Sequence, residues 1–518
     1  MLASPARRRW VLAAAVLGSS MAFLDGSTVN VALPALQASL GATVVDVQWV
    51  VNAYTLFLAS LLLTGGALGD RLGRRSVFMA GTVLFIAASI ACGLAGSVGQ
   101  LIGARAVQGI GGALLVPGSL ALVNAAYPPD QRGRAIGLWA GFSAITSAAG
   151  PVLGGWLIDV ASWRWIFFVN VPLALAVLAI AALRVPAAAG EAQEGRLDVP
   201  GAVLATAGLG GVIFALLESS SRGFADPWVL GAGGAGGVLL AAFAAVERRV
   251  ATPMLPPSLF RSRTFVGVNL MTLLIYATLS GLLFFLPMAL IQVRGYTATQ
   301  AGASTLPFVL LLFAASRWSG GLRDRVGARR PLVVGPLIVA AAFVLFASTV
   351  TAGGYWLGVF PAVTVLGVGM ALVVAPLTTT VMASVRDELA GTASGANNAV
   401  SRVAGLVAVA VFGVVMVAVF SADLQARLVA NGLPDELRRA VLEARTDLAA
   451  LTPPDGASEA HAATVSAAVD AAFLAGFRWV AASMAALAVT ASVVAAVTVS
   501  VDEGRAGPTG RAAGRRSS

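Results

Sequence analysis

Hydrophobic runs of about twenty residues recur along the whole chain, and short segments rich in arginine, glycine and polar residues separate them. A helix of about 20 apolar residues crosses the ~30 Å hydrocarbon core and satisfies its own backbone hydrogen bonds. The pattern therefore predicts an all-α membrane protein with fourteen transmembrane helices. They cover residues 10–33, 47–68, 76–97, 101–126, 134–158, 165–183, 199–217, 228–246, 265–290, 299–316, 332–350, 355–383, 394–420 and 472–500.

Composition agrees with this interpretation. Of the 518 residues, 58% are hydrophobic and only 11% are charged, whereas soluble domains carry roughly 25% charged residues. The net charge of +10 raises the question of nucleic acid binding. The arginines, however, lie in the gaps between apolar segments, so we expect a lipid bilayer and no nucleic acid as the partner.

The distribution of arginine predicts the topology. Cytoplasmic connections of bacterial membrane proteins carry an excess of basic residues. If the amino terminus is cytoplasmic, the short outer loops hold only Arg164, Arg222 and Arg294. An even number of spans then places both termini in the cytoplasm, and a composition rich in alanine, glycine and arginine without lysine favours a bacterial plasma membrane. The arginines of the inner connections are Arg71, Arg74, Arg75, Arg132, Arg134, Arg184, Arg196, Arg248, Arg249, Arg261, Arg263, Arg317, Arg323, Arg325, Arg329 and Arg330.

Several chemistries are disfavoured. Cys92 is the only cysteine and lies in an apolar run, and the only histidine, His461, lies in a polar segment. A disulfide framework, a histidine metal centre and a Ser/His triad are therefore not expected. A chain without lysine cannot contain the phosphate-binding sequence GxxxxGK[ST]. We expect no enzyme activity, no cofactor and no metal.

A repeat divides the chain. "GGALGDRLGRR" (65–75) returns as "SGGLRDRVGARR" (319–330), and "QGIGGAL" (108–114) has a fainter echo in "LGVGMAL" (366–372). Two related bundles that move against each other are a transporter architecture. The predicted domains are a six-helix bundle at 1–183, a linker with two extra helices at 184–263, a six-helix bundle at 264–503 with an extracytoplasmic loop at 421–471, and a disordered cytoplasmic tail at 504–518.

Two charged residues lie inside predicted spans. Burying an ionised carboxylate is costly, so Asp25 is a candidate proton carrier, and a nearby cation would displace its proton. Arg105 shares one helical face with Gln108 and cannot deprotonate, so it either tunes the proton site or holds helices together.

Five motifs in order resemble the major facilitator superfamily, in its fourteen-span drug:proton antiporter branch (the EmrB/QacA type). They are "LDGSTVNVALP" (24–34), "GALGDRLGRR" (66–75), "RAVQGIGGAL" (105–114), "GPVLGGW" (150–156) and "WRWIFFVNVP" (163–172). Two positions depart from the pattern. Thr146 stands where the fifth-span motif usually has glycine, and Val363 stands where the second half would match Arg105.

The resemblance implies a proton-coupled exporter of hydrophobic or cationic compounds, including antibiotics, that works by alternating access as a monomer. It assigns proton coupling to Asp25 and Arg105, and a conformational latch to Asp70, Arg71, Gly73, Arg74, Arg75, Asp324 and Arg325. It assigns the antiporter motif to Gly150, Pro151, Gly154 and Gly155. Candidates for the substrate cavity are Asn30, Gln48, Trp49, Asn52, Tyr54 and Gln108, although Trp49 equally fits an interfacial anchor.

Three alternatives stay open at the level of sequence. The chain could move one metabolite, lipid or siderophore in either direction instead of many drugs. It could be a membrane sensor without flux. A lipid-linked transferase is disfavoured because the loops lack an acidic cluster able to hold a metal.

Overall fold

The computed structural model describes residues 5–185, 198–250, 253, 255–315, 327–349, 354–386, 389–454 and 456–499, with some side chains of α5 and a few others excepted. Every regular element in these ranges is helical, and none is a strand. The elements are α1 (Pro5–Leu40), α2 (Val44–Leu72), α3 (Arg74–Leu94), α4 (Val98–Ala126), α5 (Pro129–Val160), α6 (Trp165–Phe168), α7 (Asn170–Arg184), α8 (Val199–Arg222), α9 (Pro227–Glu247), η1 (Pro257–Arg261), α10 (Arg263–Met288), η2 (Ala289–Val293), α11 (Ala298–Ala303), α13 (Arg329–Thr349), α14 (Gly354–Gly358), α15 (Phe360–Ala383), α16 (Ala390–Ala430), α17 (Asp435–Glu443), η4 (Arg445–Ala450) and α18 (Glu459–Thr498).

Thirteen helices within the described ranges are long and apolar enough to cross a membrane. The prediction of an all-helical, multi-pass membrane protein is therefore confirmed. The expected span at 134–158 falls in α5, of which only the stretch Ile145–Val160 counts as an apolar helix, and this stretch is shorter than the other thirteen.

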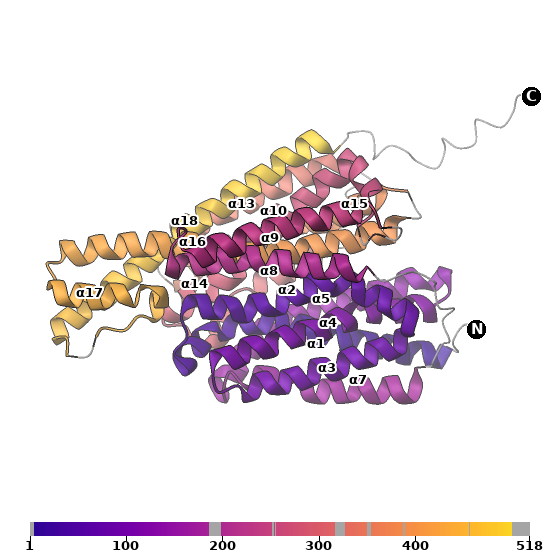
Figure 1. Cartoon of the computed structure of the whole chain (residues 1–518), viewed down its shortest axis with the longest axis horizontal. Helices are drawn as coiled ribbons and strands as arrows, with labels where there is room; N and C mark the ends of the chain where they lie inside the picture. Colours follow the sequence, from indigo (N-terminus) through magenta and orange to yellow (C-terminus); the bar gives the residue numbers. More distant parts are fainter. Residues whose placement is uncertain are drawn as a thin grey trace, which may run out of the picture. The chain divides into compact units, whose positions relative to one another are not determined.

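Packing divides the chain into two units (Figure 1). Unit 1 contains Met1–Met254, Ser280–Ala303 and Gly405–Val480, and unit 2 contains Leu255–Leu279, Ser304–Ala404 and Ala481–Ser518. Unit 1 thus combines the helices up to α9 with parts of α10, α16 and α18 and with the whole of η2, α11, α17 and η4. The domain boundaries expected at 183 and 264 stay a prediction.

Glycine allows the helices of unit 1 to approach closely. A Cβ added at Gly109 of α4 would lie 2.4 Å from the carbonyl oxygen of Tyr54 in α2, and one at Gly111 would lie 2.7 Å from the backbone nitrogen of Phe85 in α3. Backbones in such contact leave no room for side chains. The glycine-rich stretch of α4 therefore fixes the positions of α2 and α3 on either side of it.

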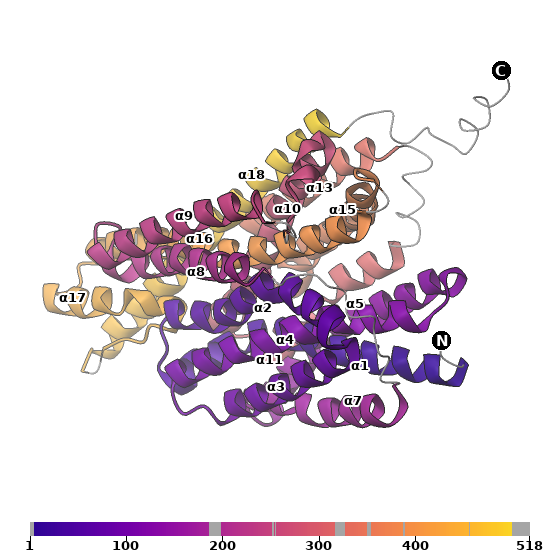
Figure 2. The same cartoon turned by 45° about the vertical axis from the view of Figure 1, so that its right-hand side comes forward.

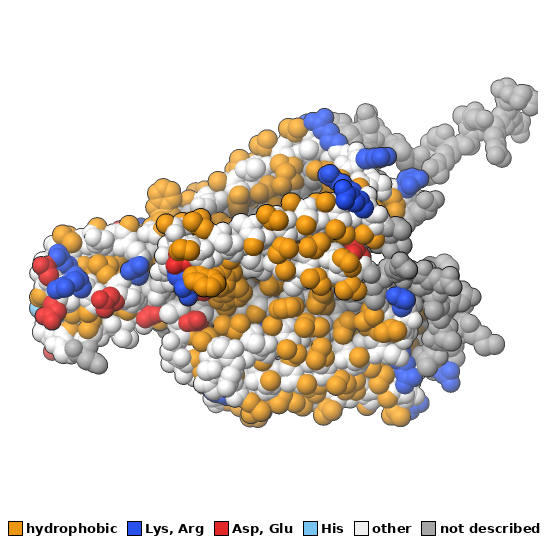
Figure 3. Space-filling view, in the orientation of Figure 1, with side chains coloured by type: hydrophobic (Ala, Val, Ile, Leu, Met, Phe, Trp, Pro, Cys, Tyr) orange, Lys and Arg blue, Asp and Glu red, His pale blue; other side chains and the backbone are white. Residues whose placement is uncertain are grey.

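Helices α8 and α9 form an antiparallel pair (Figure 2). Asp198 and Asp226 cap their amino ends, with hydrogen bonds from the backbone nitrogens of Gly201 (2.8 Å) and Trp228 (2.8 Å). Helix α8 packs on α2, where the ring centroids of Phe214 and Trp49 lie 6.3 Å apart. Hydrophobic side chains cover the visible faces of α8 and α9 in Figure 3, as lipid-facing helices require.

One end of unit 1 carries the turns at 41–43, 95–97, 161–164, 223–226 and 294–297, and we call it the Gly41 end. Elements α17 and η4 belong to this end, because η4 packs on α1, α2, η2 and α17. Charged side chains gather around α17 in Figure 3. The connection expected at 421–471 is shorter than predicted, because α16 continues to Ala430 and α18 begins at Glu459.

The internal repeat is visible in local geometry. Gly73 and Gly327 occupy the same place in the duplicated loop, and both have a positive φ, 94° and 79°. The following arginines make matching contacts within their own units. Arg75 donates to the carbonyls of Ala181 (2.9 Å) and Ala182 (2.8 Å) near the end of α7, and Arg329 donates to the carbonyl of Ala496 (2.6 Å) near the end of α18.

The fainter echo also corresponds to a matched helix crossing. Gly81 of α3 lies against Gly111 of α4, and Gly335 of α13 lies in the same way against Gly369 of α15. Gly111 and Gly369 are the equivalent glycines of "QGIGGAL" and "LGVGMAL". These crossings support the descent of the two halves from one helical repeat.

We predict opposite effects of alanine at two glycines of α4. Gly111→Ala should lower the midpoint of thermal unfolding in detergent, because overpacking typically costs about 1–3 kcal/mol. Gly103→Ala is the matched control, since nothing lies within 4 Å of its added Cβ and alanine favours a helix by roughly 0.5–1 kcal/mol. Equal midpoints for the two variants would contradict this account of the α3–α4 contact.

Candidate functional site

The two charges predicted inside the membrane lie together. Asp25 of α1 and Arg105 of α4 are each 1% exposed. Arg105 Nη1 donates to Asp25 Oδ2 at 2.5 Å. Removing two such charges from water is costly, and an excellent geometry is needed to offset it.

Gln108 closes a ring of hydrogen bonds with this ion pair. It lies one turn after Arg105 on the same face of α4, as the sequence spacing predicts. Its Oε1 accepts from Arg105 Nη1 at 2.7 Å, and its Nε2 donates to Asp25 Oδ1 at 2.9 Å. Both oxygens of the carboxylate thus receive an N–H donor from α4.

A second layer of polar contacts comes from helices that the sequence reasoning did not include. Asn170 begins α7, is fully buried, and directs Nδ2 toward Asp25 Oδ1 (3.5 Å) and Ser89 Oγ (3.1 Å) of α3. Ser89 donates to the carbonyl of Phe167 at 2.9 Å. A polar amide beside a run of apolar and aromatic residues in "WRWIFFVNVP" is the signal that could have revealed Asn170.

The rest of the Arg105 guanidinium is enclosed by protein. Its Nε donates to the carbonyl of Val50 at 3.2 Å, and its Cζ lies 4.2 Å from the ring centroid of Tyr54 and 5.9 Å from that of Phe167. An aromatic face attracts a cation most strongly where water is excluded. The charge of Arg105 is therefore held by a carboxylate, a carbonyl and two rings at once.

The other cavity candidates lie apart from this network. Gln48 donates to the carbonyl of Val409 in α16 at 3.0 Å, and Trp49 packs against α8. Asn30 is half-buried. Asn52 is fully buried, and neither atom of its amide has a hydrogen-bond partner in the part of the chain that the structure describes. An unsatisfied amide is costly, so Asn52 is the candidate best suited to receive a polar group of a bound molecule.

The fifth-span motif packs on α1. A Cβ added at Gly154 would lie 2.2 Å from Cγ2 of Thr28, and the carbonyl of Gly150 accepts a hydrogen bond from Thr28 Oγ1 at 3.2 Å. Thr146, which departs from the motif, bonds to Ser20 of α1 at 3.0 Å. The departure therefore replaces a small residue with a polar link to the same helix.

The opposite side of α5 packs on α11. A Cβ added at Gly155 would lie 2.3 Å from the carbonyl oxygen of Ala298, and one at Gly302 would lie 2.0 Å from that of Pro151. Asp159 accepts hydrogen bonds from the backbone nitrogens of Ala298 (3.1 Å) and Thr299 (2.9 Å) and from Thr299 Oγ1 (2.6 Å). These contacts join the first half of the chain to the second at the Gly41 end of unit 1.

The latch residues are described only in part. Arg71 is exposed, and Arg74 donates to the carbonyl of Ala121 at 3.4 Å. Arg75 binds the end of α7, as given above. The side chain of Asp70 and the residues Asp324 and Arg325 lie outside the described part of the chain, so the latch stays a prediction.

Comparisons with known proteins agree with the resemblance drawn from the motifs. A family model described as Major Facilitator Superfamily matches residues 15–409. The tetracenomycin C resistance and export protein of Streptomyces glaucescens is 33% identical over 95% of this chain and 92% of its own length. The multidrug resistance protein Stp of Mycobacterium tuberculosis is 34% identical over 83% of this chain and 80% of its own length.

The fold matches solved structures as well. A bacterial homologue of the human lysosomal transporter Spinster, solved in an inward-facing and unoccupied conformation, aligns over 95% of this chain and 98% of its own chain. The TM-score is 0.65 at 18% sequence identity, so the likeness concerns the fold alone.

The buried network predicts a non-additive effect on stability. Arg105→Met should lower the midpoint of thermal unfolding, because removing one partner of a buried ion pair typically costs about 3–5 kcal/mol. The double variant Asp25→Asn/Arg105→Met should recover part of that loss, since no unpaired charge remains. A double variant less stable than Arg105→Met alone would show that the two residues do not act as a pair.

Proposed function

The chain belongs to the major facilitator superfamily, and on this premise we propose that it exports hydrophobic or cationic compounds, antibiotics among them, in exchange for protons. Named relatives that export or resist antibiotics support the class of cargo. The observation that carries the proton coupling is the buried hydrogen-bonded ring of Asp25, Arg105 and Gln108.

The ring couples a proton to helix position through competition at Asp25. Arg105 and a proton both neutralise the same carboxylate, so protonation of Asp25 removes the reason for Arg105 to stay at 2.5 Å. The guanidinium would then be held by Gln108 of its own helix, by the carbonyl of Val50 and the ring of Tyr54 on α2, and by the ring of Phe167. Loading the proton therefore loosens α1 from α4, and losing it draws them together again.

A proton gradient supplies enough energy for this exchange. A potential of about 100 mV provides ~2.3 kcal/mol for each charge that crosses. Since a tenfold concentration ratio corresponds to ~1.4 kcal/mol, one net charge supports roughly a 50-fold gradient of cargo. No nucleotide is needed for such a cycle.

We further propose that the Gly41 end is extracytoplasmic, that both termini are cytoplasmic, and that the chain is a monomer in a bacterial plasma membrane. The concentration of arginine in the opposite connections supports this orientation. In this arrangement α5 also crosses the membrane and brings the number of spans to fourteen. Helices α8 and α9 then form a hairpin inserted between bundles at 1–183 and 264–503. The close contact of α5 with α11 supports a state that is closed toward the outside.

Asp25→Asn should abolish uphill transport. We expect inside-out vesicles that carry this variant to lose proton-driven accumulation of a fluorescent cation, because the neutral amide can neither take up nor release the proton. Glu218→Gln is the control, since Glu218 pairs with Arg222 at the far end of α8. Accumulation by Asp25→Asn at the wild-type level would remove Asp25 from the coupling role.

Gly155→Val should open the Gly41 end. The side chain has no room against α11, and a steric cost of about 1–3 kcal/mol would reduce the closed state by roughly 5- to 150-fold. The measurement is labelling of Asn30→Cys, a half-buried position two turns deeper on α1, by an impermeant thiol reagent applied to whole cells. Gly137→Val in the same helix, where nothing lies within 4 Å, should leave the labelling rate unchanged. Equal rates in both variants would contradict the proposed closure.

A further inference from the structure

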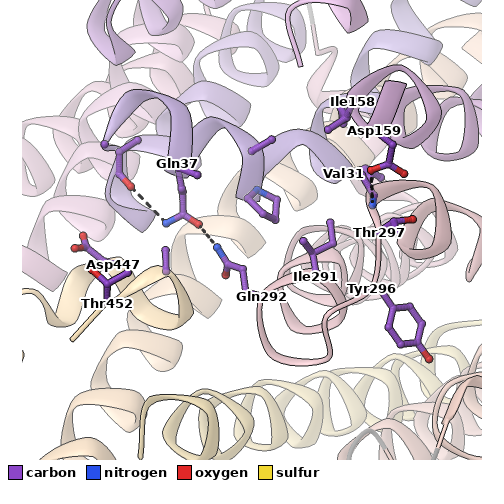
Figure 4. Close-up of a pocket in the computed structure, with 17 residues that line it drawn as sticks. Val31, Gln37, Ile158, Asp159, Ile291, Gln292, Tyr296, Thr297, Asp447 and Thr452 are labelled. Carbon is purple, nitrogen blue, oxygen red and sulfur yellow. Dashed lines mark hydrogen bonds between the residues drawn. The ribbon is translucent and has the colours of Figure 1, made fainter. Parts of the chain in front are cut away.

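A cavity of about 800 Å³ lies at the Gly41 end of unit 1 and shares no lining residue with the Asp25 network (Figure 4). Its walls come from α1, α5, the turn between η2 and α11, and η4. The mechanism proposed above makes no use of it. Pockets for drug-sized ligands generally measure about 300–1,000 Å³, so its volume suits an organic molecule better than a bare ion.

The lining combines apolar walls with negative charge. Val31, Pro34, Ile158 and Ile291 supply hydrophobic surface. Two carboxylates, Asp159 and Asp447, line the same space, and no arginine is among the described residues that surround it. Apolar walls with uncompensated negative charge are complementary to a hydrophobic cation.

The two carboxylates differ in the number of their hydrogen-bond partners. Asp159 is engaged by the amino end of α11 through three hydrogen bonds. Asp447 is half-buried, and its carboxylate has no hydrogen-bond or ion-pair partner in the described part of the chain. Burial, with a smaller contribution from the negative charge of Asp46, raises the pKa of Asp447. A cation beside Asp447 would offset both the cost of burying its carboxylate and the repulsion from Asp46.

Amide groups add polar contacts to the floor of the cavity. Gln292 Nε2 donates to Gln37 Oε1 at 2.9 Å, and Gln37 Nε2 faces the carbonyl of Ala42 at 3.5 Å. Figure 4 shows the pair of glutamines side by side within the cavity. The Oε1 atom of Gln292 is buried without a partner among the described residues, so it can accept a hydrogen bond from a ligand.

The fold holds Asp447 in place beside the cavity. The next residue, Leu448, is fully buried and has a φ of 52°, which a non-glycine residue rarely adopts. Packing of η4 on α1, α2 and η2 keeps this conformation. The position of Asp447 is thus set by a packed segment and not by a loose loop.

We propose that this cavity is a second binding site, in which a hydrophobic organic cation places its positive charge beside Asp447 on the way out of the protein. The inference rests on the proposed function for the chemistry of the cargo and for the outward direction. The apolar walls receive the body of the molecule, and Gln292 accepts a hydrogen bond if the cation carries an N–H group.

The test uses the full-length chain in lipid nanodiscs. Cys92 is the only native cysteine and is buried, so Ala38→Cys at the exposed rim can be labelled selectively with an environment-sensitive fluorophore. Titration with tetraphenylphosphonium should give a saturable signal. Asp447→Asn should weaken binding about tenfold, as expected for the loss of one partly buried charge contact. Asp447→Glu should restore most of the affinity.

Two controls separate this site from its surroundings. Asp435→Asn removes an acid that pairs with Arg438 in α17, outside the cavity, and should leave the affinity unchanged. Glu218→Gln removes an acid that pairs with Arg222 in α8, also outside the cavity, and should likewise leave the affinity unchanged. Loss of saturable binding in the wild type, or equal weakening by Asp435→Asn and Asp447→Asn, would overturn the proposal. Either result leaves the transport test of Asp25→Asn independent, so failure of one does not imply failure of the other.

Discussion

The ion pair between Asp25 and Arg105 is the constraint on which the arrangement of the first helices depends. Neither charge reaches water, so each must be satisfied by protein alone. Asp25 draws donors from α4 and α7, and Arg105 draws acceptors from α1, α2 and its own turn of α4. Four helices therefore contribute contacts to one buried ion pair. Protonation of Asp25 would change the contacts that all four helices make with it. The glycines of α4 permit the close approach that this ion pair needs.

Helix α5 carries the complementary constraint, which is steric. Its small residues contact α1 on one side through Gly150 and Gly154, and α11 on the other through Gly155. The first contact lies within the first half of the chain, and the second crosses to the second half. Because α1 also holds Asp25, a change in the α1–α4 pair can reach the crossing at α11 through one intervening helix. Helix α1 therefore carries one partner of the buried ion pair and also the close contact with α5.

Much of this could be predicted from the sequence. The helical class followed from hydrophobic runs alone. The rarity of charges in such runs singled out Asp25 and Arg105 as candidates, but their direct contact comes from the structure. Asn170 was missed because a buried amide adds little to a pattern of hydrophobicity, and its role comes from contacts between helices far apart in sequence. The same reason applies to Trp49, which packs on α8, and to η4, whose fold depends on partners in α1, α2 and η2. Sequence periodicity reports which face of a helix is apolar but not which helix covers it.

The arginines that follow the duplicated glycine turns differ in whether both copies of the loop keep them. The last carbonyls of any helix have no partner within that helix and need donors from elsewhere. Arg75 supplies donors to the end of α7, and Arg329 supplies them to the end of α18. Arg74, by contrast, corresponds to Ala328 in the second copy. The position that keeps its arginine in both copies is therefore the one whose side chain completes the end of a neighbouring helix, whereas Arg74 donates to a carbonyl at 3.4 Å before the last turn of α4.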